Sequence, residues 1–223
     1  MSMSGWSGAL STSWKRHRSL LLPAYLGGFA VCAIAAYAGE GLHYYIDLRD
    51  GTGRFSGLMS LASGFALLAF GWSFLAVSRS PLARSNRFAW IGVGLLGVML
   101  AFDEVLQLHE GAAAMMVRAG VPAPFGLDSD LYIFGAYAGI AAVLALKLRP
   151  SLGRLPDLAL PALLAIVFFA LSQGIDLLPW QAFRHDQQQW VGAAEEGSKC
   201  LGSWSLALLG LILLQSPEAR RTD

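Results

Sequence analysis

The feature that most constrains the fold is a series of six apolar runs. They cover residues 19–39, 56–78, 88–109, 130–148, 157–178 and 190–214. A helix needs about 20 apolar residues to cross a hydrocarbon layer about 30 Å thick. Hydrophobic residues make up 55% of the 223-residue chain and charged residues only 14%, which is too apolar for a soluble domain of this size. The sequence therefore predicts an all-α integral membrane protein, a bundle of six transmembrane helices.

The connections between these runs are short and rich in Gly, Pro, Ser or charge, so none forms a second domain. We therefore expect a cytoplasmic N-terminal segment at 1–18, a membrane domain at 19–214 and a cytoplasmic tail at 215–223. The first run follows the basic stretch "KRHR" and also fits a secretory signal, but we interpret it as a retained helix. The glycines of "GVGLLG", residues 92–97, predict close packing between helices.

Charge is distributed unevenly across the predicted membrane. With a cytoplasmic N-terminus, eleven of the sixteen Lys and Arg residues fall on the inner side, as the positive-inside rule expects. Twelve of the fifteen acids fall on the outer side. Because acids contribute little to orientation, this outer acidic layer needs a separate explanation.

The acidic layer is densest in "MLAFDEVLQLHEG", residues 99–111, at the end of an apolar run. Unpaired charges at such depth are costly, so they indicate function more often than elsewhere. Other runs contribute titratable residues at about the same depth. They are Glu40 and His43 at the end of the first run, Asp176 in the fifth, and Glu195, Glu196 and Lys199 in the sixth.

Helical phase shows which of these side chains share a face. On a continuous helix, Asp103 and Glu110 lie on one side at i, i+7, whereas Glu104 and His109 diverge by about 100° each way. Either Gly111 ends the helix early enough to free His109, or one of the diverging pair has another partner.

The last run contains a second pattern of charges. Glu195 and Lys199 form an i, i+4 pair that we expect to satisfy each other, which leaves Glu196 directed elsewhere. In the first run, Glu40 and His43 have the E-x-x-H spacing with which di-iron bundles place a carboxylate and an imidazole on one metal.

The motifs "FDEVLQLHE" and "EEGSK" resemble those of a loosely defined group of uncharacterised bacterial membrane proteins with six helices. That group has an (L/F)-D-E-x4-H-E signature late in one helix and an acidic pair early in the last. The resemblance implies a multi-pass protein of the bacterial inner membrane, without an established activity. It also implies that one site is formed by Asp103, Glu104, His109, Glu110, Glu195 and Glu196.

The first functional hypothesis is a metal-dependent membrane enzyme, a hydrolase or oxidoreductase acting on a lipid-soluble substrate. Carboxylate and imidazole ligands suit Fe, Mn or Zn, which would activate water or an oxygen species. Glu104 or Glu110 would act as the general base. The candidate metal ligands are Glu40, His43, Asp103, His109, Asp176, Glu195 and Glu196.

Two other functions use the same residues. One is a proton- or cation-coupled transporter or channel, in which the carboxylates and histidines bind and release protons. The other is an accessory subunit whose acids bind a partner in a larger complex. A structural interpretation, in which the acids are solvated at a helix end, stands beside them. Nucleic-acid binding has no support, because the basic residues lie in the short cytoplasmic loops.

Overall fold

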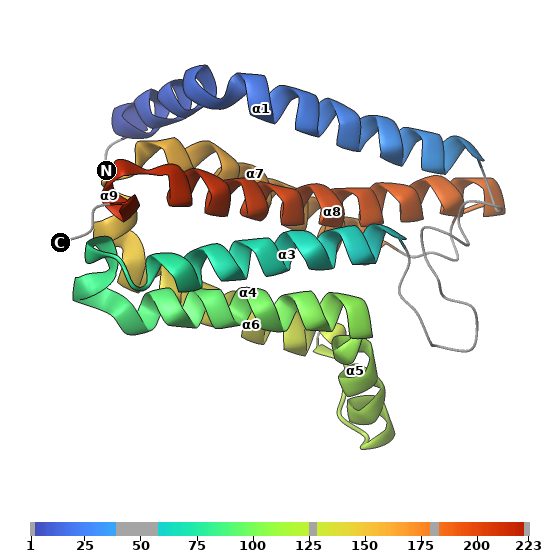
Figure 1. Cartoon of the computed structure of the whole chain (residues 1–223). Helices are drawn as coiled ribbons and strands as arrows, with labels where there is room; N and C mark the ends of the chain where they lie inside the picture. Colours follow the sequence, from blue (N-terminus) through green and yellow to red (C-terminus); the bar gives the residue numbers. More distant parts are fainter. Residues whose placement is uncertain (1–2, 39–57, 125–128, 179–182, 221–223) are drawn as a thin grey trace.

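The structure is a computed structural model that describes residues 3–38, 58–124, 129–178 and 183–220. Within these ranges the regular elements are all helical (Figure 1). The α-helices are α1 (Met3–Ala38), α3 (Leu58–Val77), α4 (Arg87–Leu106), α5 (Leu108–Arg118), α6 (Asp130–Leu152), α7 (Ala159–Asp176), α8 (His185–Gln215) and α9 (Pro217–Arg220). Two short 3-10 helices, η1 (Pro81–Asn86) and η3 (Pro156–Leu158), lead into α4 and α7.

Five segments among the described residues are long and apolar enough to cross a membrane. They are Met59–Val77, Pro81–Leu106, Asp130–Leu152, Pro156–Asp176 and Trp190–Gln215. The chain is therefore an all-helical, multi-pass membrane protein. The described part of α1 contributes the shorter apolar stretch Leu21–Ala30, so a sixth crossing at 19–39 stays a prediction.

Helices α3 and α4 approach each other through glycines. A Cβ at Gly71 of α3 would lie 2.7 Å from the carbonyl oxygen of Gly94, and a Cβ at Gly97 would lie 2.9 Å from the Cα of Gly71. Real Cβ atoms essentially never come so close, so only glycine permits this approach. The close packing predicted from "GVGLLG" is confirmed.

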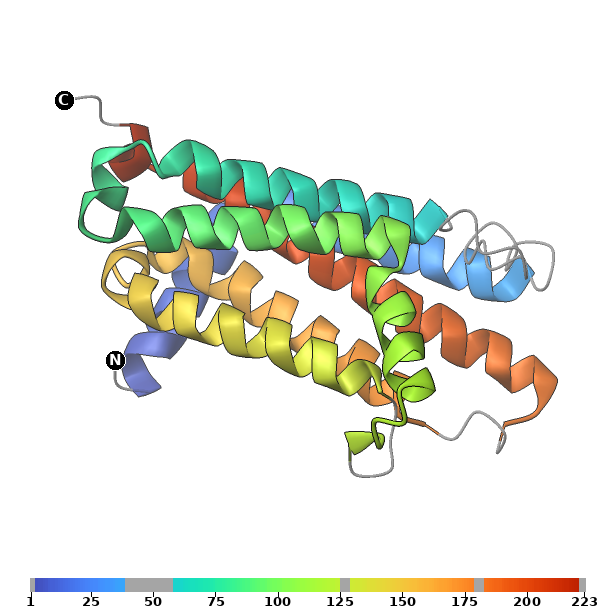
Figure 2. The same ribbon diagram turned by 90° about the horizontal axis from the view of Figure 1, so that it is seen from below.

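The other helices are arranged around α8. This helix packs against α3 on one side and α7 on the other, while α1 crosses over α7 and α8 (Figure 1). Helix α6 lies beside α4 and contacts α5 (Figure 2). Helix α8 is the most enclosed of the candidate spans and α6 the least.

The main hydrophobic core lies toward one end of the bundle. Phe74 of α3 packs its ring 5.2 Å from that of Trp90, which is fully buried at the start of α4. Leu148 of α6 and Leu213 of α8 complete the contact and are also fully enclosed. We call this the basic end, because it also carries most of the described Lys and Arg residues.

The two ends of the bundle differ in charge as the sequence predicts. At the basic end, Arg16 of α1 pairs with Asp157 of η3, and the Ser13 hydroxyl donates a 2.6 Å hydrogen bond to the Asp157 carbonyl. Helix α9, the start of α1 and the α3–α4 connection lie at this end (Figure 1). Helix α5, Glu104 and the start of α8 lie at the opposite end, which we call the acidic end.

Candidate functional site

The acidic end is shaped by a break in the third apolar run. Helix α4 ends at Leu106, and Gln107 adopts the left-handed conformation with φ 52° and ψ 42°. Helix α5 begins at the next residue and turns across the direction of the spanning helices (Figures 1 and 2). The predicted continuous run 88–109 is therefore wrong at its end, and the break precedes Gly111 by four residues. A non-glycine residue rarely takes this conformation, so surrounding contacts must hold it.

Asp103 supplies those contacts. Its buried carboxylate accepts a 2.7 Å hydrogen bond at Oδ1 from the backbone N–H of His109, and its Oδ2 lies 3.0 Å from the His109 Nδ1. The first N–H groups of a helix have no partner within the helix and attract negative charge. Asp103 therefore caps α5 from the preceding helix. The face predicted for Asp103 and Glu110 at i, i+7 is wrong, because it assumed a continuous helix.

His109 is set in a polar and aromatic environment. Burial alone lowers the pKa of its imidazole, but the hydrogen bond and the charge of Asp103 outweigh this and hold the pKa above its ordinary value. From α6, the charge of Asp130 acts in the same direction, and the Phe134 ring lies 5.1 Å from the imidazole ring. Tyr137 of α6 interacts with the Asp103 carboxylate. These contacts therefore favour the protonated imidazolium over the neutral ring more than water does.

Glu104 points into the bundle toward a second group of charges. Lys199 of α8 places its Nζ 3.9 Å from the Glu104 Oε1 and donates a 2.7 Å hydrogen bond to Glu196 Oε1. The three side chains are 11% to 22% exposed. In the described structure, Glu104 Oε1 and Glu196 Oε2 are buried and accept no hydrogen bond. We call Glu104, Lys199 and Glu196 the ion cluster.

In the last run, the expectation that Glu196 is directed elsewhere is wrong, because Lys199 bonds to it at i, i+3. The expected proximity of Glu195 to Lys199 is not contradicted, since the charge of Glu195 also acts on that lysine. Residues three and four apart both lie beside a lysine on a helix, so spacing does not choose between Glu196 and Glu195. The divergence of Glu104 and His109 is real, and each has its own partner: Lys199 for Glu104 and Asp103 for His109.

The remaining predicted residues are distributed around this end. Glu110 lies in the first turn of α5, Asp176 is the last residue of α7, and Glu195 precedes Glu196 on α8. Glu40 and His43 fall outside the described residues. Sequence reasoning missed Tyr137 and the contact of Lys199 with Glu104. The sequence does carry one signal for the Lys199–Glu104 contact: Lys199 is a basic residue at the same predicted membrane depth as the acidic residues.

These donors do not assemble a metal centre within the described ranges. No group of three or more His, Cys, Asp or Glu side chains there converges in a way that could hold an ion. The Lys199 ammonium lies beside the two carboxylates of the ion cluster, where a cation would otherwise bind. A metal site therefore stays a prediction that depends on Glu40 and His43.

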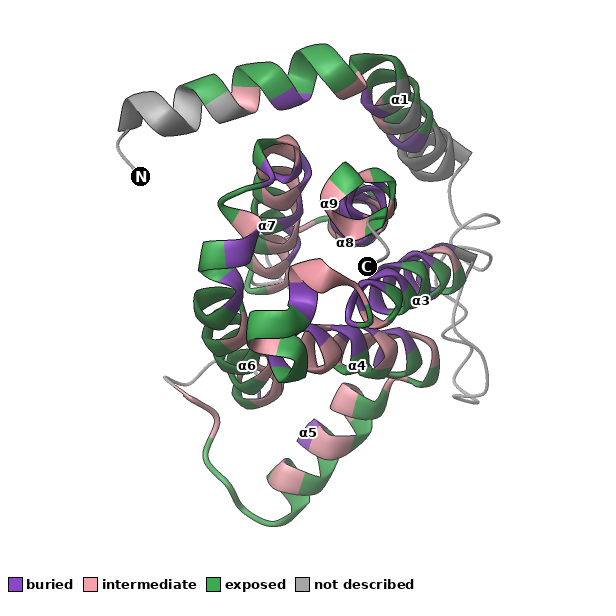
Figure 3. Ribbon diagram, turned by 60° about the vertical axis from the view of Figure 1, so that its left-hand side comes forward, coloured by how far each residue is buried: buried purple, intermediate pink, exposed green. Residues whose placement is uncertain are grey.

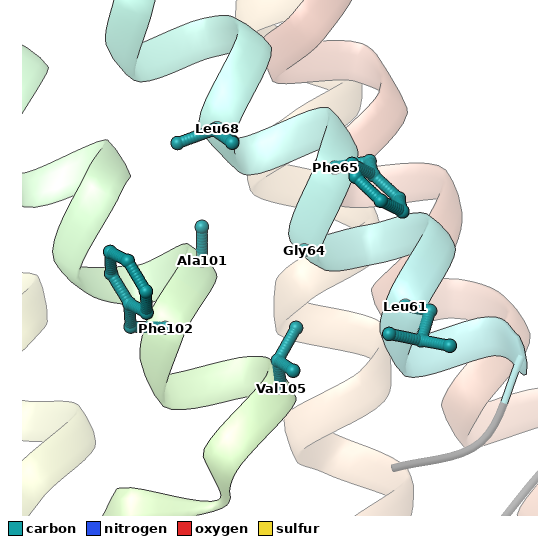
Figure 4. A pocket seen from close by; sticks show the side chains of 7 residues that line it. All are labelled: Leu61, Gly64, Phe65, Leu68, Ala101, Phe102 and Val105. Carbon is teal, nitrogen blue, oxygen red and sulfur yellow. The ribbon is translucent and has the colours of Figure 1, made fainter.

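A lateral groove lies between α3 and α4 near the acidic end (Figure 4). Its volume is about 210 Å³, and no titratable side chain contributes to its wall. Such a groove fits a hydrocarbon chain rather than a polar ligand. The side chains around it include Leu61, Phe65 and Leu68 of α3 and Ala101, Phe102 and Val105 of α4.

Comparison with known proteins identifies a family for the chain but does not indicate an activity. No curated protein and no solved structure matches the chain. A family model described as a domain of unknown function (DUF8692) matches residues 28–214, from α1 to near the end of α8. This is consistent with the resemblance to an uncharacterised group. Because the match covers most of the sequence, the chain belongs to this family.

Proposed function

We propose that the chain is a proton-coupled membrane transporter in which the ion cluster is the proton-binding site. The observation that carries this proposal is that two carboxylates from different helices share one ammonium group. With all three groups ionised, the cluster has a net charge of −1, which is costly in a membrane interior. One proton on either carboxylate makes the cluster neutral. The ion cluster can therefore take up and release one proton at Glu104 as its surroundings change.

His109 and Asp103 supply the second part of the proposal. Asp103 precedes Glu104 on α4 and binds His109, which lies just beyond the end of α4. Burial lowers the pKa of His109, but the Asp103 carboxylate outweighs this and holds the pKa above its ordinary value. We assign to His109 the exchange of protons with water on that side. The basic end faces the cytoplasm of a bacterial inner membrane in this scheme, because ten of the thirteen described Lys and Arg residues lie there.

Proteoliposomes provide the test of proton transport. A potassium diffusion potential drives protons inward, and a pH-sensitive dye inside the vesicles reports their arrival. We expect flux above that of protein-free vesicles for the unmodified chain and loss of this excess in Glu104→Gln. Glu218→Gln is the matched control, because Glu218 lies on α9 at the basic end. A flux equal to that of protein-free vesicles, at every pH in which the protein is folded, would contradict the proposal.

Orientation has a separate test. In a background without Cys32 and Cys200, a cysteine at Val121, which is 40% exposed near the end of α5, should react with an impermeant thiol reagent added to intact cells. A cysteine at Ser85 of η1, which is exposed at the basic end, should react only after the cells are opened. Labelling of position 85, but not of position 121, in intact cells would mean that the acidic end faces the cytoplasm.

A metal-dependent enzyme acting on a lipid-soluble substrate is the second candidate. The apolar groove between α3 and α4 favours it, because Ala101 and Val105 border both the groove and Glu104 along α4. Metal analysis of the purified protein separates the two proposals. The enzyme requires a stoichiometric metal that is lost in His43→Ala and His109→Ala, whereas the transporter requires none.

A further inference from the structure

We propose that α5 lies flat in the membrane–water interface at the acidic end of the bundle, with Leu108 and Met115 directed toward the acyl chains of the surrounding lipids. The partner of this exposed helix face is therefore the bilayer itself. This inference goes beyond the proposed function, and it is independent of whether protons are transported.

The length and direction of α5 restrict where it can lie. Eleven residues at 1.5 Å per residue give a helix about 16 Å long, which is about half the thickness of the hydrocarbon layer. The helix runs across the direction of the spanning helices in two perpendicular views (Figures 1 and 2). It also lies outside the group of spanning helices in a third view (Figure 3). A helix of this kind either lies in the plane of the membrane surface or projects into water.

The inner side of α5 is fixed to the bundle. Ala113 is 6% exposed, and His109 is bound to Asp103 and packs on Phe134 of α6. The outer side leaves Leu108 and Met115 51% and 64% exposed. These two residues are seven apart, so they lie on the same side of the helix. One side of α5 is therefore occupied by the protein and another side is apolar and open.

The open side continues a surface that already faces lipid. Phe102 and Leu106 lie on the spanning helix α4 and are 57% and 59% exposed, so lipid surrounds them in a multi-pass protein. Leu108 follows Leu106 by two residues, after the break at Gln107. Hydrocarbon contact is favourable for such apolar side chains, whereas exposure to water is not. Continuity with the lipid-facing surface of α4 thus identifies lipid, rather than water, as the medium around Leu108 and Met115.

The other end of α5 suits the lipid headgroups. Arg118 is exposed in the last turn, where its guanidinium can reach phosphate groups while its alkyl stem contacts acyl chains. Amphipathic helices in the interface have this combination of an apolar side and basic residues. In this position, Leu108 marks the level of the membrane surface.

This level has a consequence that does rest on the proposed function. Glu104 lies two residues before Leu106, the last residue of α4, which corresponds to about 3 Å along that helix. The ion cluster then lies within about one helical turn of the interface. Protons would need to travel only this distance to reach water at the acidic end.

Spin labels in proteoliposomes test the position of α5. In a background with Cys32→Ser and Cys200→Ala, nitroxides are attached to Met115→Cys, to Arg118→Cys, and to Phe102→Cys as the lipid-facing reference. Collision with oxygen reports lipid, and collision with a water-soluble nickel complex reports water. We expect the oxygen-to-nickel ratio at position 115 to exceed that at position 118 several-fold and to lie below that at position 102, which is deeper in the bilayer.

Three results would overturn the inference. Ready collision with nickel at position 115 would mean that α5 projects into water. Protection from both reagents with dipolar broadening would mean that a second copy covers it, and protection without broadening would mean another protein. Leu108→Cys repeats the measurement independently if the Met115 variant does not fold. Proton flux is measured in a separate assay, so the position of α5 and proton transport can each fail without affecting the test of the other.

Discussion

The two ends of the bundle use buried side chains in opposite ways. At the basic end, Phe74, Trp90 and Leu213 enclose one another in an apolar core, and the charged residues lie mostly outside it. At the acidic end, charged residues lie inside: Asp103 is 4% exposed, and the ion cluster is mostly buried. The apolar core stabilises the fold by burial alone, whereas buried charges are tolerated only if each of them has a partner.

This difference assigns separate tasks to the two ends. An apolar core has one favourable state, and it needs no change of protonation to remain stable. A cluster with two carboxylates and one ammonium has at least two states, which differ by one proton. Groups that are costly to bury are retained most often where function needs them. We therefore expect substitutions at the basic end to change stability and those at the acidic end to change pH dependence.

The largest effect is expected in the core of the basic end. Trp90→Ala removes a fully buried indole and should lower the free energy of unfolding by about 3–5 kcal/mol. Phe102→Ala on the same helix is the matched control, because Phe102 is 57% exposed and its loss leaves no cavity. Denaturant titration in detergent micelles measures both. Equal losses for the two variants would mean that the basic end is not the stabilising core.

Loss of the shared cation should be the next largest effect. Lys199→Met leaves the Glu104 and Glu196 carboxylates near each other without a counter-charge. Because Lys199 and Glu196 are about one-fifth exposed, we expect a loss of about 2 kcal/mol rather than the full cost of a buried unpaired charge.

The same substitution has an internal control. Adding Glu104→Gln to Lys199→Met should restore much of the stability, because the Glu196 carboxylate then no longer faces a second carboxylate at position 104. A double-mutant cycle gives the coupling energy between positions 104 and 199. Additive losses would show that Glu104 and Lys199 do not interact and would contradict the existence of the ion cluster.

A smaller and more local loss is expected at the cap of α5. Asp103→Asn keeps one acceptor oxygen but removes the negative charge, and should destabilise the first turn of α5 by about 1 kcal/mol. Amide hydrogen exchange at His109 and in the following turn measures this opening directly. Unchanged exchange there, or a loss spread equally over all helices, would argue against a cap.

The attachment of α5 should also depend on pH. The pKa of His109 is raised in the folded state, so its contribution is complete below the ordinary histidine value of about 6.5 and is lost as pH rises through the raised value. We expect faster exchange in α5 above that range, and a weaker pH dependence in Asp103→Asn. Exchange that slows as pH rises, after correction for the intrinsic rate, would reverse the sign and contradict the assignment.

The smallest effect concerns the helix break. Gln107 has a positive φ, which is strained for a residue with a Cβ and unstrained for glycine. Gln107→Gly should therefore raise the free energy of unfolding by about 0.5 kcal/mol, after the entropy of glycine in the unfolded chain is included. A clear destabilisation would indicate that the Gln107 side chain, rather than Asp103, holds the break.

Features that depend on local pattern were predictable from the sequence. Five of the six apolar runs correspond to the candidate spans among the described residues, and "GVGLLG" predicted the close contact of α3 with α4. The separation of basic and acidic ends followed from counting charges along the alternating connections. Each of these features depends on residues that are near one another in the chain.

Features that depend on tertiary contacts were not predictable in the same way. The break at Gln107 has neither glycine nor proline at the turn itself, and it is held by Asp103. The contact of Lys199 with Glu104 depends on the register between α4 and α8, which no spacing within one helix reveals.

The central claim is that the ion cluster takes up a proton inside the membrane, and infrared difference spectroscopy between two pH values tests it most directly. The account predicts a band from a protonated carboxyl group that changes in Glu104→Gln or Glu196→Gln and persists in Glu218→Gln. A spectrum in which neither position 104 nor position 196 contributes a protonated carboxyl band, at any pH where the protein is folded, would contradict it.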